Sequence, residues 1–95
     1  MNMNESKRPV VVTTEYRGVF FGYLEKENSD RSVVLTQCRN CIKWTTEVNG
    51  FGGLAVTGPL HGCKIGPAIP KIKLESRTAI LECTQEAESA WTNFK

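Results

Sequence analysis

The sequence predicts an α+β domain that is mostly β: a small antiparallel sheet with a long Gly-rich loop and a short C-terminal helix. Three observations predict this class. Residues 9–27 are rich in valine, threonine and aromatic side chains, a composition typical of strands. Six of the eight glycines lie within residues 49–67, where a loop is expected. Thr84 is a good N-cap for a last short helix.

The length of 95 residues predicts one small domain, residues 9–95, behind a flexible leader at residues 1–8. A chain of this size buries a modest core and cannot enclose a large ligand. We therefore expect a binding site in a groove or between subunits, and a homo-oligomer is a reasonable expectation. The apolar fraction of 40% is typical of a globular domain and argues against disorder.

Charge and hydropathy exclude several classes of partner. The net charge is only +2 and no basic run is present, so neither DNA nor RNA is an expected partner. The apolar runs are too short for a membrane span. The polar N-terminus has no hydrophobic segment of the kind that directs secretion. These features predict a cytoplasmic protein whose four cysteines are thiols or metal ligands, not disulfides.

The strands are expected in the following order. In residues 9–27, alternation places Val19, Phe21 and Tyr23 on one face, and a bulge or sharp bend is expected at Gly18. A polar turn follows at residues 25–30. Residues 31–48 read as a second hairpin arm, or as two strands that meet near residues 39–40.

The second half of the chain begins with a turn signal at residues 49–50. The Gly-rich stretch after it has room for one helical turn around Leu54, and it matches no phosphate-binding motif. Its backbone N–H groups would still be available to an anion, although an ordinary inter-strand loop is the favoured interpretation. Residues 70–83 resume the alternation of a strand. In the last helix, Ala87, Ala90 and Trp91 form one stripe that can dock on the sheet.

Cysteine and histidine spacing raises the alternative of a zinc site. Cys38, Cys41, His61 and Cys63 would supply four ligands. In a strand, however, positions three apart face opposite ways, and the spacing of His61 and Cys63 is unusual for zinc. Buried thiols are therefore favoured. No catalytic pair of side chains is recognisable, so we expect neither an enzyme nor a cofactor nor a metal.

Aromatic and cationic side chains provide the candidate ligand contacts. Aromatic faces and guanidinium planes stack on bases, and arginine binds phosphate oxygens in a bidentate manner. The predicted ligand-binding residues are Tyr16, Arg17, Arg39, Trp44, Phe51, Thr57 and Lys64. For Trp44 and Phe51, a place in the core is the alternative and is the usual one in a small sheet domain.

Several motifs together resemble a known family: TxYRGVFFGYL, CRNCIKW, GLAVTGP with GCKIGP, and AILECTQEA. Over residues 10–86 the chain resembles small phage-encoded proteins that include anti-CBASS sponges. The resemblance implies a homo-oligomer, with a tetramer suspected, in the host bacterial cytoplasm. It would evade immunity by holding a cyclic dinucleotide such as 3′,3′-cyclic GMP-AMP without cleaving it. The alternative is a small phage interaction or structural module that binds a protein through its sheet edge and has no nucleotide ligand.

Overall fold

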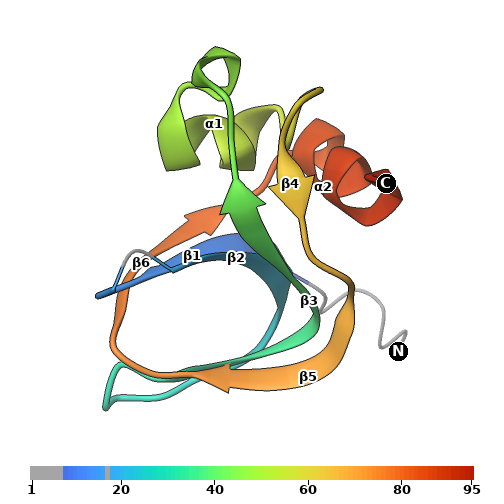
Figure 1. Ribbon diagram of the computed structural model, residues 1–95. Coiled ribbons are helices and arrows are strands. Elements are labelled where there is room, and N and C mark those ends of the chain that lie inside the picture. Colours follow the sequence, from blue (N-terminus) through green and yellow to red (C-terminus); the bar gives the residue numbers. More distant parts are fainter. Residues whose placement is uncertain (1–7, 17) are drawn as a thin grey trace.

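A curled antiparallel sheet of six strands forms the body of the protein, and two short α-helices lie together at one side of it (Figure 1). The computed structural model describes residues 8–16 and 18–95. In chain order the elements are β1 (Pro9–Thr14), β2 (Val19–Glu27), β3 (Val33–Lys43), the 3₁₀-helix η2 (Thr46–Val48), α1 (Gly50–Val56), β4 (Lys64–Ile65), β5 (Ile69–Leu74), β6 (Arg77–Glu82) and α2 (Gln85–Asn93). The predicted mostly β, antiparallel architecture and the C-terminal helix are confirmed.

The strand order is β6-β1-β2-β3, and β3 has two neighbours on its far side. The first part of β3 pairs with β5, and its last residues pair with β4. Within the part that pairs with β5, Gln37 has a φ of 51°, which marks a local irregularity of the strand. Strand β3 nevertheless continues to Lys43, so residues 39–40 lie inside one strand and are not the junction of two. Residues 44–48 leave the sheet, and the last three of them form η2.

Both faces of the sheet are buried, and the predicted alternation separates them. Val19, Phe21 and Tyr23 belong to the cluster under the helices, as expected, while Phe20 and Leu24 belong to the cluster inside the curl. The buried residues inside the curl are Val10, Val12, Val33, Leu35, Cys38 and Leu74. Those under the helices are Val11, Val19, Phe21, Cys41, Val48, Leu54, Ala55, Cys63, Ala87 and Trp91.

The Gly-rich stretch is not one long loop, which corrects the prediction. It contains the whole of α1, two turns instead of the single turn expected, and the short strand β4. Glycine is a poor helix former, so tertiary contacts must hold α1. Leu54 is fully buried, and the indole N–H of Trp91 donates to its carbonyl oxygen at 2.9 Å. A Cβ on Gly53 would overlap the carbonyl oxygen of Val48, so glycine allows α1 to lie against η2.

A second correction concerns residues 70–83, which form two strands and not one. The chain turns at residues 75–76, where Ser76 has a φ of 58°. The carbonyl of Ser76 accepts from the N–H of Glu15, and the N–H of Arg77 donates to the carbonyl of Arg31. This turn is therefore tied to both of the other turns at this end of the sheet.

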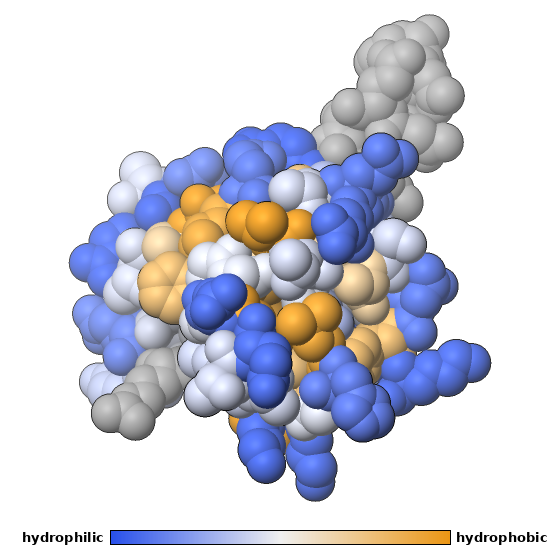
Figure 2. Space-filling view, turned by 90° about the horizontal axis from the view of Figure 1, so that it is seen from above, coloured by the Kyte–Doolittle hydropathy of each residue, from blue (hydrophilic) through white to orange (hydrophobic). Residues whose placement is uncertain are grey.

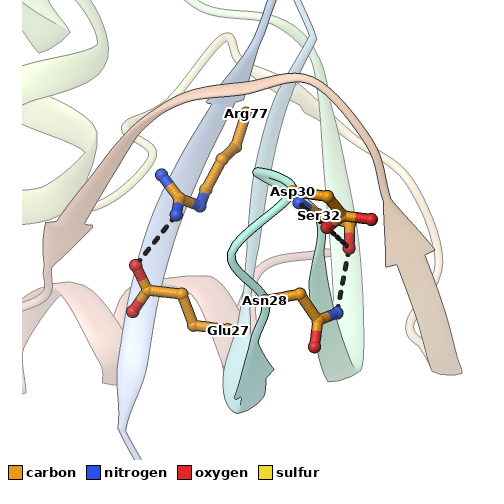
Figure 3. A network of polar contacts seen from close by, with 5 residues as sticks. All are labelled: Glu27, Asn28, Asp30, Ser32 and Arg77. Atoms are coloured by element: carbon orange, nitrogen blue, oxygen red, sulfur yellow. Dashed lines mark hydrogen bonds and ion pairs between the residues drawn. The ribbon is translucent and has the colours of Figure 1, made fainter.

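Polar contacts also stabilise the β2–β3 turn (Figure 3). The Ser32 hydroxyl donates to Asp30 at 2.6 Å and accepts from the Asn28 side chain at 2.9 Å. Beside them, Arg77 contacts Glu27 at 3.0 Å and so links the start of β6 to the end of β2. Hydrogen bonds from Ser32 lower the pKa of the Asp30 carboxyl.

The ends of the domain are fixed by local contacts. The Thr84 hydroxyl accepts from the N–H of Ala87 at 3.0 Å, which confirms the predicted N-cap. Trp91 is fully buried and stacks on Phe21 with ring centroids 5.2 Å apart. Of the predicted leader, residues 1–7 lie outside the described residues. Arg8 is part of the fold, because its carbonyl accepts from Leu24 and its side chain pairs with Glu82.

Among the described helices, none has the length and apolar character that a membrane span requires.

Candidate functional site

One cavity of the described structure lies where β1, β2 and β6 meet the segment that leads into α1. Its volume is about 610 Å³. The lining residues are Thr13, Thr14, Glu15, Gly18, Val19, Trp44, Phe51, Thr78 and Ala79. This volume lies within the usual range for sites that hold small molecules.

Small side chains and hydroxyl groups from the sheet line one part of the cavity. The hydroxyls of Thr13 and Thr78 form a hydrogen bond of 2.6 Å that links β1 to β6. At Gly18, a Cβ would overlap the hydroxyl of Thr14 and the ring of Phe20, so a larger residue would have to displace these side chains. Gly18, Ala79 and the threonines have small side chains, and larger side chains at these positions would fill the cavity.

Two aromatic side chains, Trp44 and Phe51, also line the cavity. Trp44 follows the end of β3 and is 37% exposed, and Phe51 lies in the first turn of α1 and is 45% exposed. Neither belongs to the buried clusters, so the alternative of a core position does not hold for them. Viewed from above, the molecule shows several hydrophobic groups interspersed with hydrophilic side chains (Figure 2).

The cavity has little charge among the residues that the structure describes. Glu15 is the one ionisable side chain in its lining, and its carboxylate lies 3.4 Å from the Arg31 guanidinium. The rest of the lining is mostly apolar and includes two aromatic side chains and three threonines. The arrangement therefore suits a ligand with flat rings and hydrogen-bonding edges.

Arg39 lies elsewhere, beside a second hollow of about 290 Å³ that Tyr23 and Thr92 also line. Its Nε donates to the carbonyl of Gly66 at 2.8 Å. Its Nη1 donates to the carbonyls of Trp91 at 2.7 Å and Phe94 at 2.9 Å, at the end of α2. These bonds give Arg39 a structural role, because a cation at a helix C-terminus satisfies carbonyls and opposes the helix dipole.

The other predicted contact residues are spread over the molecule. Tyr16 is 90% exposed in the β1–β2 turn, between the lining residues Glu15 and Gly18. Arg17 lies outside the described residues. Thr57 is the C-cap of α1, and its hydroxyl donates to the carbonyls of Gly53 and Gly58. Lys64 is exposed on β4 opposite Lys43.

The cysteines are not gathered into one site. Cys38 lies inside the curl, whereas Cys41 and Cys63 lie under the helices. In the described ranges, no group of three or more His, Cys, Asp or Glu side chains is placed to hold a metal. Burial raises the pKa of the Cys38 and Cys83 thiols to about 12 and that of Cys41 to about 11. These thiols are therefore protonated and poorly nucleophilic near neutral pH.

Sequence reasoning missed the threonines of the cavity. Thr13, Thr14 and Thr78 read as ordinary strand residues, and only the pairing of β1 with β6 brings them together. The repeated threonine at the end of the first strand was the only available signal, and it is a weak one. Trp44 and Phe51, in contrast, were identified and are brought together.

A family model described as a domain of unknown function, DUF6948, matches residues 7–91. The chain therefore belongs to the DUF6948 family. Neither a curated protein nor a solved structure matches the chain.

Proposed function

We propose that this DUF6948 protein is a binding protein that holds a cyclic dinucleotide in the cavity beside Trp44 and Phe51 and leaves it intact. One observation carries the proposal: two partly exposed aromatic side chains line a cavity of about 610 Å³ whose lining also includes three threonines. A base stacked on an aromatic side chain contributes about 1–3 kcal/mol. Hydroxyl groups supply hydrogen bonds to base edges and sugars.

The chemistry of the lining supports binding without conversion. Glu15 is the one described ionisable residue of the cavity, and it is already paired with Arg31. The buried thiols of Cys38 and Cys41 belong to the core clusters and not to the lining. A protein that sequesters a messenger needs stacking surfaces and hydrogen bonds, and it needs no general base.

The phosphates of the ligand require cations, and the described lining has none. In the proposal, the bases occupy the cavity and the phosphates lie at the β1–β2 turn. Arg17 lies outside the described residues but directly precedes the lining residue Gly18 in the chain, so it stays the predicted phosphate contact. The resemblance to anti-CBASS sponges supplies the biological role: a phage protein that removes an immune messenger in the host bacterial cytoplasm.

Calorimetric titration with 3′,3′-cyclic GMP-AMP, cyclic di-AMP and cyclic di-GMP tests the proposal. Loss of one stacking side chain in Trp44→Ala or Phe51→Ala should weaken binding about 5- to 150-fold. Ile42→Ala is the matched control, because Ile42 is 62% exposed close to Trp44 in sequence and does not line the cavity. Bound nucleotide released by denaturation should be chromatographically intact. No heat with any of the three ligands, or a cleaved product, would refute the proposal.

A protein-binding module is the second candidate function, and a different observation favours it. Ile42 and Val56 are exposed large hydrophobic residues in addition to Trp44 and Phe51. Exposed apolar groups of this kind often mark a protein contact. In that case Ile42→Ala should weaken the capture of a protein partner as strongly as Trp44→Ala, and no nucleotide should bind.

A further inference from the structure

Strand β6 has one unpaired edge in the described structure. It pairs with β1 alone, and the N–H of Cys83 donates to the carbonyl of Pro9 at 2.9 Å. In an antiparallel ladder the bonded positions alternate, so the main-chain groups of Ala79 and Leu81 also point toward β1. Those of Ile80 and Glu82 then point away from the sheet. Further along, the N–H of Thr84 is bound by the carbonyl of Ala55, which ends the open edge.

A second open edge of the sheet, on β5, is protected and the edge on β6 is not. Natural edge strands avoid pairing with other chains by carrying proline and lysine. Strand β5 contains Pro70, Lys71 and Lys73. Strand β6 has the sequence RTAILE, which contains neither proline nor lysine and is apolar in its middle. Of the two six-residue edge strands, β6 is therefore the unprotected one, and the third edge strand, β4, is only two residues long and contains Lys64.

The charges of β6 are complementary to those of a second β6 in antiparallel orientation. The strand begins with Arg77 and ends with Glu82. Their partners on β1 are Thr14 and Val10, two positions on the same face, so both side chains lie on one face. The register shifts at Thr78, so an antiparallel pair centred on Ile80 runs regularly from Ala79 to Glu82 and brings Glu82 of the second copy near Arg77. There it would join the ion pair that Arg77 makes with Glu27, while Glu82 also contacts Arg8 of its own chain. Such an interface is isologous, as in most two-fold dimers.

We infer that two copies of this chain pair through β6 and form one continuous sheet across a two-fold axis. This inference does not depend on the ligand, but it bears on the cavity. In this register Leu81 of the second copy lies opposite Ala79, a lining residue. The second copy therefore extends the wall of the cavity, and the dimer carries two such cavities related by symmetry.

Sedimentation of the full chain with the variant Glu82→Pro tests the dimer. The N–H of Glu82 points outward, so proline should remove one hydrogen bond of the dimer and obstruct the second strand without breaking the bonds to β1. The control Glu82→Ala loses the same ion pair with Arg8 but keeps the N–H. We expect a dimer for the wild type, a dimer weakened less than about fivefold for Glu82→Ala, and a folded monomer for Glu82→Pro.

Amide hydrogen exchange of the wild type gives an independent readout that needs no variant. The amides of Ile80 and Glu82 should become protected as protein concentration rises, whereas the amide of Leu81, bonded to β1, should be protected throughout. Three results would each overturn the inference: a wild type that stays monomeric up to its solubility limit, a folded Glu82→Pro variant that dimerises normally, or a dimer in which the Ile80 and Glu82 amides exchange as fast as in dilute solution.

Discussion

The two faces of the sheet bury their side chains in different ways. Inside the curl, the buried side chains are aliphatic except for the Cys38 thiol, and the curvature of the sheet itself encloses them. On the other face, separate elements provide the cover: α1, α2 and the Phe21–Trp91 stack. That cover stops before the end of β1 and the start of β6, and the cavity with Trp44 and Phe51 lies there. The difference shows that a sheet covered by separate pieces can leave a site open where the cover ends.

The largest expected effect comes from removing the centre of the helical cover. Trp91→Ala should lower the free energy of unfolding by about 3–5 kcal/mol, because it deletes a fully buried indole, its stack on Phe21 and its hydrogen bond to Leu54. Trp44→Ala, the same change at the cavity, should lower it by less than about 1 kcal/mol. Urea unfolding of both variants measures the contrast, and equal losses would contradict the distinction between core and site.

The next largest effect concerns Arg39, a residue of β3 whose side chain is hydrogen-bonded to carbonyls at the C-terminal end of α2. Arg39→Met should cost about 2–3 kcal/mol of stability, because three carbonyl groups lose their donors. The control Arg31→Met removes only an exposed contact with Glu15 and should cost less than about 1 kcal/mol. Thermal unfolding and ligand titration are read together. A loss of ligand affinity without a loss of stability would show that Arg39 contacts the ligand and has no structural role.

A smaller effect is expected at the cap of α2. Thr84→Ala removes the side-chain acceptor for the N–H of Ala87 and a bond to the carbonyl of Val56. The expected cost is about 1 kcal/mol. Thr92→Ala, in the last turn of the same helix, should change stability by only a few tenths of a kcal/mol. Chemical denaturation resolves the two, and an unchanged Thr84→Ala variant would mean that the cap contributes nothing.

The smallest expected effect is the change in stability near pH 9 that comes from ionisation of the Cys38 thiol, inside the curl. Burial raises the pKa of Cys38 from 9.0 to about 12 in the folded protein. The contribution of the protonated thiol is fully present below pH 9. It falls as pH rises from 9 toward 12, because the unfolded chain ionises first. The stability difference between the wild type and Cys38→Ala, measured by denaturation at several pH values, should therefore shrink above pH 9. A difference that does not change with pH would refute this.

The sequence predicted the structural features that depend on patterns within a few residues, and it missed those that depend on contacts between distant segments. Alternation in residues 19–24 assigned the two faces correctly, and Thr84 marked the start of α2, because both patterns act within a few residues. Helix α1 was predicted as no more than one turn around Leu54 because its glycines have low helix propensity, and burial of Leu54 against other elements decides its structure. The turn at Ser76 was missed because the positive φ of this serine does not change the alternation of polar and apolar residues in the sequence.

The candidate site was predicted in part for the same reason. Trp44 and Phe51 attracted attention by residue type alone, and the structure places both beside the cavity. Arg39 was chosen because arginine is hard to bury, yet carbonyls at the end of a distant helix accommodate it. The threonines of the cavity come together only through the pairing of β1 with β6, which no local pattern indicates.

Strand β3 serves two parts of the molecule at once, since one half pairs with β5 and the other with β4. The segment from η2 through β4 is therefore held by the same backbone that closes the curled sheet. A force or a denaturant that frees this segment must also loosen the middle of β3. We expect the two parts to lose their amide protection together, in one cooperative opening, with no surviving core of the curled sheet alone.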